Sequence, residues 1–172
     1  MLAFSFLLLN ASSCTKDNGQ KLPPETLDGN GTFGCLLNGK VWLPSGMPFS
    51  TPATIIWASD SSLIIGANQG LSQSMGIVLK KIPIKSNTVY TLNTDSNSIA
   101  TYEYKCDNGS FCYYQTNAKY TGQLTITKFD TLNKIVSGKF SFKNIFNKVQ
   151  ADCNCDTSIM EITDGRFDLK YY

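Results

Sequence analysis

Residues 166–171 read R-F-D-L-K-Y, a strict alternation of charged and apolar side chains near the C-terminal end of the chain. In an extended strand Phe167, Leu169 and Tyr171 point to one face, and the three charged residues between them point to the other. An antiparallel sheet with one buried and one solvated face produces this pattern. The stretch therefore predicts a strand from Ile159 to Tyr171 in such a sheet.

The same alternation appears earlier in the chain. Leu124 and Ile126 fall two apart in the segment Tyr120–Phe129, and Phe140 and Phe142 do so in the segment Ile135–Phe146. Asn38-Gly39 is a favoured two-residue hairpin turn, and polar turns separate most of the other strand signals. These signals are Phe33–Leu37, Lys40–Leu43, Thr54–Ala58, Leu63–Ala67, Met75–Ile84 (interrupted by Pro83), Val89–Leu92, Thr101–Cys106 and Phe111–Gln115.

No stretch shows a sustained helical period, and strands do not alternate with helices. A single helical turn around residues 144–151 is the most helix that we expect. We predict one all-β domain over residues 32–172, an antiparallel β-sandwich or flattened barrel of about 8–10 strands with hairpin connections.

Composition excludes several classes of function. Of the 172 residues, 42% are hydrophobic and 16% are charged, and the formal net charge is +2. No basic run exceeds Lys80-Lys81, so nucleic acid is not an expected partner. The sequence has no histidine, which removes Ser-His-Asp and Cys-His nucleophile pairs and every histidine-containing zinc site. We expect a protein that is not an enzyme and that uses no cofactor.

The N-terminal residues predict export. Residues 1–9 form an apolar run of signal-peptide length, far short of the roughly 20 residues that span a bilayer. Ala11, Ser12 and Ser13 then place small side chains before Cys14, as in a bacterial lipobox. Cleavage by the ordinary signal peptidase and a buried N-terminal strand are the alternatives. We expect a lipoprotein-type signal peptide over residues 1–13 and lipidation of Cys14.

A polar stretch with two prolines and several glycines follows Cys14 and predicts a flexible tether over residues 14–31. Acyl chains on Cys14 would attach the protein to a membrane. Thr15-Lys16-Asp17 resembles the surface-export tag of Bacteroidota lipoproteins. The expected location is the outer membrane, on its periplasmic or cell-surface face.

Five further cysteines favour disulfides, because an exported chain enters an oxidising compartment. Cys106 and Cys112 flank one hairpin turn and are expected to form one bond. Cys35 is expected to bond either Cys153 or Cys155, which leaves one thiol free. The alternatives are partly free thiols, or a zinc or Cu(I) site of Cys106, Cys112, Cys153 and Cys155, against which the C-x5-C and C-x-C spacings argue. We predict no metal.

Two further sets of residues suggest ligand chemistry. The aromatic residues could stack on a sugar or small ligand, although cross-strand aromatic pairs are ordinary sheet stabilisers. They are Trp42, Trp57, Tyr102, Tyr104, Tyr113 and Tyr114. Asp164 and Asp168 flank an apparent turn at Gly165 and could act as a hydrolase pair only if they faced each other in a cleft.

Four blocks in order carry a family resemblance: TFGCLLNGKVWLP (32–44), GQLTITKFD (122–130), IVSGKFSF (135–142) and ITDGRFDLKY (162–171). The set resembles a family of small Bacteroidota lipoproteins with a β-rich domain of unknown function. The resemblance implies export, lipid anchoring and a β-rich fold, and it carries over no catalytic residue.

The leading hypothesis is a membrane-anchored, non-enzymatic binding or structural module of the cell envelope, with an unidentified envelope partner or small ligand. A small-ligand or glycan-binding surface lipoprotein is the second hypothesis. A hydrolase that acts through paired carboxylates is the third.

Overall fold

The computed structural model describes residues 19–46, 51–58, 60–93, 97–149 and 153–171, and these residues form eleven strands and no helix. The predicted signal peptide and Cys14 lie outside the described residues. The strands are β1 (Thr32–Leu37), β2 (Lys40–Trp42), β3 (Ala53–Trp57), β4 (Leu63–Gln69), β5 (Gln73–Leu79), β6 (Thr88–Leu92), β7 (Ser98–Lys105), β8 (Phe111–Gln115), β9 (Gly122–Asp130), β10 (Ile135–Val149) and β11 (Met160–Lys170).

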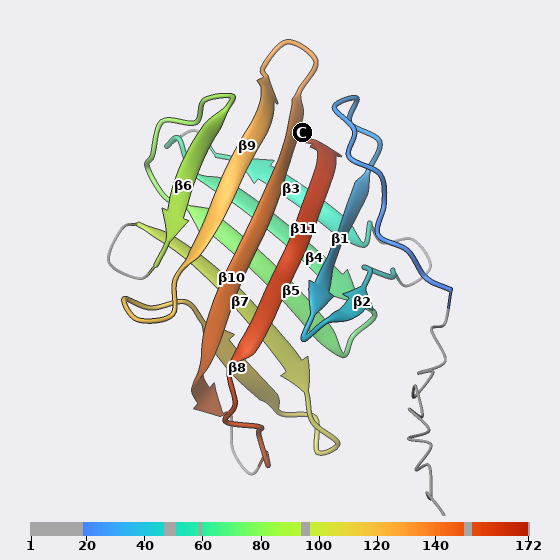
Figure 1. Ribbon diagram of the computed structural model, residues 1–172, viewed down its shortest axis with the longest axis vertical. Helices are drawn as coiled ribbons and strands as arrows, with labels where there is room; N and C mark the ends of the chain where they lie inside the picture. Colours follow the sequence, from blue (N-terminus) through green and yellow to red (C-terminus); the bar gives the residue numbers. More distant parts are fainter. Residues whose placement is uncertain (1–18, 47–50, 59, 94–96, 150–152, 172) are drawn as a thin grey trace, which may run out of the picture.

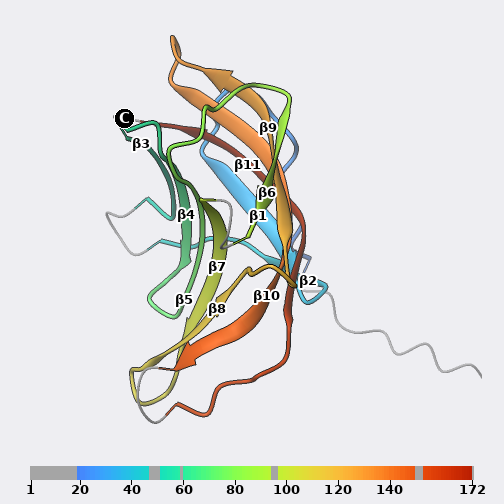
Figure 2. The same ribbon diagram turned by 90° about the vertical axis from the view of Figure 1, so that its left-hand side faces the viewer.

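All strand pairs are antiparallel, and the strands form two layers (Figures 1 and 2). The front layer of Figure 1, called sheet A, has the order β2-β1-β11-β10-β9-β6. The second layer, sheet B, has the order β3-β4-β5-β7-β8 and continues into the end of β10. The predicted all-β antiparallel sandwich is confirmed, with eleven strands where about 8–10 are predicted. The two layers are continuous through β10 but do not close into a barrel.

Strand β10 joins the two layers. Its first half pairs with β9 and β11 in sheet A, and Ile145–Val149 pairs with β8 in sheet B. Register shifts at Phe140/Phe142 and Phe146/Lys148 accompany this change of partner. The helical turn expected around residues 144–151 is therefore wrong as far as residue 149, because β8 supplies backbone partners that keep the chain extended.

The alternating apolar residues fill the space between the layers. Phe140, Phe167 and Leu169 are each at most 4% exposed, as the sequence pattern predicts. Hairpins shape the ends of the sandwich, and Asn38 and Gly39 have φ values of 48° and 76°, as a type I′ turn requires. The largest fully buried apolar side chains are Tyr114, Leu63, Ile65, Ile77, Leu79, Leu92, Leu124, Ile126, Ile162 and Val136.

Candidate functional site

The segment of residues 22–31, called the strap, runs along the outer side of sheet A before it enters β1 (Figure 1). The carboxylate of Asp168 in β11 holds it. This carboxylate accepts five hydrogen bonds from the described residues, at distances of 2.6–3.1 Å. The donors are the hydroxyls of Thr26 and Ser137 and the backbone amides of Asp28, Gly29 and Asn30.

A tight backbone bend lets successive amides converge on one carboxylate. Gly29 has φ +72°, and a Cβ atom there would lie 2.7 Å from the Cγ atom of Lys170. A larger residue at this position would meet both backbone strain and steric overlap. Glycine at position 29 therefore allows the strap to close around Asp168.

Asp168 is 1% exposed, and two opposing effects act on its pKa. Burial raises the pKa, and the hydrogen bonds from Thr26, Ser137, Asn30 and Gly29 lower it by more, to about 2. The group is therefore ionised at neutral pH. A buried charge is tolerated here because its oxygen atoms are hydrogen-bonded.

The strap corrects the predicted domain boundary. The sequence predicts a flexible tether over residues 14–31, but Thr26 and residues 28–31 are hydrogen-bonded to β11, including Gly31 N to the Asp168 carbonyl at 2.8 Å. The tether as predicted is therefore too long at its C-terminal end. The turn-forming residues of this stretch form a bend around the Asp168 carboxylate. The sequence does not show that Asp168 lies next to this stretch.

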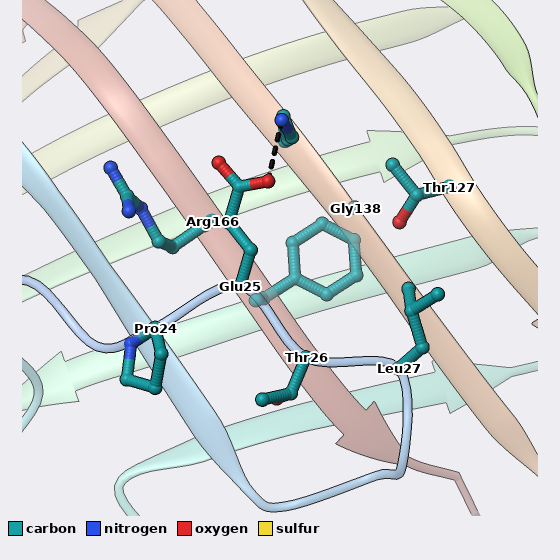
Figure 3. Close-up of a pocket in the computed structure, with 9 residues that line it drawn as sticks. Pro24, Glu25, Thr26, Leu27, Thr127, Gly138 and Arg166 are labelled. Atoms are coloured by element: carbon teal, nitrogen blue, oxygen red, sulfur yellow. Dashed lines mark ion pairs between the residues drawn. The ribbon is translucent and has the colours of Figure 1, made fainter.

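A cavity of about 250 Å³ lies beside the strap (Figure 3). Pro24, Glu25, Thr26 and Leu27 line one side, and residues of β9, β10 and β11 line the other. The residues from the strands are Thr127, Gly138, Lys139, Arg166 and Phe167.

Three charged groups stand at this cavity. The Glu25 carboxylate lies 2.6 Å from Lys139 Nζ, and Figure 3 shows the Glu25 side chain beside Arg166. The hydrogen bond from Lys139 and the positive charges of Lys139 and Arg166 outweigh desolvation and lower the pKa of Glu25. Arg166 also donates to the Pro23 carbonyl oxygen, at 3.5 Å. Lys139 thus pairs with the Glu25 carboxylate, and Arg166 adds a second positive charge from the neighbouring strand.

The hollow continues along the outer face of sheet A. A second cavity of about 400 Å³ shares Glu25, Lys139 and Arg166 with the first, and it adds polar side chains from all three strands. These polar side chains are Gln123, Thr125, Ser141, Thr163 and Asp164. Together the two cavities form one groove, called the strap groove, and Lys139 and Arg166 lie where the two cavities meet.

The six aromatic residues singled out in the sequence do not form a binding surface. Trp42, Tyr102 and Tyr114 are at most 4% exposed, and Trp42 Nε1 and the Tyr102 hydroxyl both donate to Gln73 Oε1. Tyr104 stacks on Tyr114 with ring centroids 5.9 Å apart.

The remaining two rings are separated from this cluster. Trp57 packs on Phe129, with ring centroids 5.1 Å apart. Tyr113 is next to Tyr114 in β8 and therefore points to the opposite face of that strand. The prediction that these rings form a ligand-stacking platform is wrong, because sheet alternation directs most of them into the core.

The disulfides differ from the expected pairs. Cys106 bonds Cys153 and Cys112 bonds Cys155, with Cα–Cα distances of 6.1 and 5.7 Å. Cys35 is free and buried. The predicted Cys106–Cys112 bond and the predicted bond from Cys35 to Cys153 or Cys155 are therefore wrong.

Strand register explains the first correction, and the position of Cys35 in the core explains the second. Cys112 lies opposite Tyr104 in the β7–β8 pair, whereas Cys106 lies beyond the end of β7. Cys35 lies in the core with its Sγ atom 3.8 Å from Met75 Sδ. Burial raises the pKa of the Cys35 thiol to about 12, which makes it a poor nucleophile.

Asp164 and Asp168 do not face each other as the hydrolase hypothesis would require. Gly165 lies within β11 rather than in a turn, and Asp164 has φ +51° where the register of β10 and β11 shifts. Asp164 is exposed, and Asp168 is enclosed by the strap. The structural role of Asp168 is hidden in the sequence because the residue occupies an ordinary solvent-face position in the alternation.

Among the described residues, no helix is long and apolar enough to span a membrane. No curated protein and no solved structure matches the chain. The sequence profile of a domain of unknown function, DUF6252, matches residues 45–167. This match covers well over half of the chain, and the chain therefore belongs to the DUF6252 family.

Proposed function

We propose that this protein is a lipid-anchored, non-enzymatic binding protein of the bacterial outer membrane, and that the strap groove holds a ligand that carries a carboxylate. The observation that carries the binding proposal is the Glu25 carboxylate at the cavity, which pairs with Lys139 and is also stabilised by the positive charge of Arg166. Glu25 is half exposed and belongs to a surface segment, so a ligand carboxylate can replace it without disturbing the core.

The chemistry around the two cations favours an acidic oligosaccharide. Thr125, Ser141, Thr163 and Gln123 offer hydroxyl and amide groups along the same groove, and these groups suit the hydroxyls of a sugar. This version of the glycan hypothesis relies on a charged, hydroxyl-rich sheet face rather than on aromatic stacking. A sequence without histidine supports binding over catalysis.

The anchoring proposal depends on the sequence before the described residues. Small residues precede Cys14 after an apolar run, and the two disulfides suit an oxidising compartment. The strap, which leads from the N-terminal part of the chain into β1, runs along the outer side of sheet A, the side that carries the groove (Figure 2). The groove would therefore lie near the attachment point.

Titration of the full-length protein in detergent with trigalacturonic acid, followed by calorimetry, tests the binding proposal. We expect Lys139→Ala to weaken binding at least tenfold, and Glu25→Gln to strengthen it because the internal competitor is removed. Lys143→Ala is the matched control, since Lys143 also lies on β10 and pairs with a half-exposed carboxylate, Glu161, at 3.0 Å. An equal loss in both lysine variants, or no binding by the parent or by Glu25→Gln, contradicts the proposal.

Metabolic labelling with a radioactive or alkyne-tagged palmitate tests the anchor. We expect the full chain expressed in bacteria to incorporate label and to sediment with outer membranes, and Cys14→Ala to lose both properties. Cys35→Ala serves as the control because its thiol is buried in the core. Label that persists in Cys14→Ala, or a parent chain without label, rules out lipidation at this residue.

A further inference from the structure

Four sulfur atoms gather where sheet B meets the segment between β10 and β11. The Sγ atoms of Cys106, Cys112, Cys153 and Cys155 all lie within 4.8 Å of one another. Beyond the two disulfides, Cys112 Sγ lies 3.4 Å from Cys106 Sγ and 3.2 Å from Cys153 Sγ. Each sulfur is thus close to three others and not only to its bonded partner.

Local backbone geometry brings these sulfurs together despite their unusual spacing in the sequence. The hairpin closes with a hydrogen bond from Cys106 N to Ser110 O, so Cys112 returns beside Cys106. Cys155 N donates to Cys153 O at 3.0 Å, which folds the C-x-C segment into a three-residue turn. This turn lets both of its sulfurs face the hairpin.

The dimensions of the cluster suit a tetrahedral metal ion. Zinc binds four thiolates at about 2.3 Å, which places neighbouring sulfurs about 3.8 Å apart. The four sulfurs lie within 4.8 Å of one another, which is close to this separation, and three of the four residues are half-buried while Cys112 is fully buried. Thiolate sets of this kind select zinc or Cu(I) over hard cations.

Contacts other than the disulfides also hold the C-x-C segment in place. The Tyr114 hydroxyl donates to the Asp156 carbonyl oxygen, and Asp156 N donates to the Tyr104 hydroxyl at 3.1 Å. These contacts involve no sulfur, so opening the disulfides does not itself remove them. The four thiols of the reduced protein would therefore remain near one another.

We propose that the four cysteines form a zinc-binding site when both disulfides are reduced, so that the same sulfurs exist either as two disulfides or as one metal centre. A dithiol reductant supplies the electrons: two dithiol molecules transfer four electrons and four protons and become two disulfides. The four protein thiols then bind one Zn²⁺ and release four protons. This inference goes beyond the proposed function and does not depend on it.

Cobalt titration of the reduced full-length protein under anaerobic conditions tests the site. We expect one Co²⁺ per chain, with the intense visible absorption of tetrahedral cobalt and a sulfur-to-cobalt charge-transfer band, both removed by one equivalent of Zn²⁺. The oxidised protein should give neither band. Native mass spectrometry of the zinc-loaded protein should show one retained ion.

Variants from the two sides of the cluster provide the controls. Cys106→Ser and Cys155→Ser should each weaken metal binding at least 100-fold, and Cys35→Ser should leave it unchanged. Circular dichroism of the reduced parent checks that the fold persists. Tetrahedral cobalt bands that survive in both serine variants overturn the proposal, as does a reduced parent that binds no cobalt, whether or not it remains folded.

Discussion

Two irregular segments are fastened to this sandwich in different ways. The strap is held to sheet A by hydrogen bonds to one buried carboxylate, that of Asp168. The segment with Cys153 and Cys155 is held to the β7–β8 hairpin by two disulfides. The first attachment responds to pH and the second responds to reductant, so the two can be released separately.

Both segments need side-chain interactions to stay attached to the sandwich. Neither segment belongs to a strand, so neither gains the backbone ladder that holds the rest of the chain. The carboxylate gathers the amides of a bend, and the disulfides restrict the conformations of the unfolded chain. Four experiments test whether the two attachments are independent, and the experiment with the largest expected effect comes first.

Removal of both disulfides should have the largest effect. The bonds close loops with sequence separations of 47 and 43, and one loop of this size contributes roughly 4 kcal/mol. We expect Cys106→Ser combined with Cys112→Ser to lower the free energy of unfolding by about that amount, as measured with urea. Loss of a single bond, as in Cys106→Ser with Cys153→Ser, should cost much less because the other bond closes nearly the same loop. Equal losses in the two variants would contradict this account.

Asp168→Asn should have the next largest effect. The asparagine side chain keeps one acceptor oxygen, but its NH2 group faces groups of the strap and Ser137 that are themselves hydrogen-bond donors. The free energy of unfolding should therefore fall by about 3 kcal/mol. Hydrogen exchange should show faster exchange of the Gly29 and Asn30 amides. Asp130→Asn is the control, since Asp130 accepts its hydrogen bonds in an exposed turn. Unchanged exchange at Gly29 in Asp168→Asn would show that something else holds the strap.

Acid should release the strap with a smaller effect. The pKa of Asp168 is about 2 in the folded protein and has an ordinary value of 3.8, so the carboxylate stabilises the fold above pH 4. This contribution, about 2 kcal/mol, is lost as the pH falls from about 4 towards 2. Urea unfolding at several pH values should show this slope in the parent and a reduced slope in Asp168→Asn. An identical slope in both proteins would assign the acid sensitivity to other groups.

Lys139→Ala should have the smallest effect on the fold. Its ion pair with Glu25 is half exposed, and such pairs add little to stability because solvent screens them. We expect an unchanged midpoint of urea unfolding and unchanged exchange of the Gly29 amide, although ligand binding in the strap groove is reduced. A strap that loosens in this variant would mean that the groove and the strap are not independent.

Much of the fold could be predicted from local pattern. Alternation in residues 166–171 places Phe167 and Leu169 inside, and Asn38-Gly39 gives a hairpin turn, because both signals act over a few residues. The exit of β10 from one layer into the other could not be predicted, because its new partner, β8, lies about 30 residues earlier in the chain.

The candidate site was less accessible to prediction for the same reason. Glu25, Lys139 and Arg166 are ordinary surface residues in the sequence, and only the docking of the strap across β10 and β11 brings them together. The aromatic residues are of a type that stacks on ligands, but the alternation of side chains along a strand does not show which face of the sheet is buried.

Composition and short-range periodicity are enough to predict the class of fold, the inward-facing residues of the C-terminal strands, the absence of histidine chemistry and an exported chain anchored at Cys14. The disulfide partners, the burial of Asp168 under the strap and the meeting of Lys139 with Arg166 at one cavity could be found only in the folded chain. Each of these depends on contacts between residues far apart in the chain, and strand register rather than sequence proximity fixes such contacts.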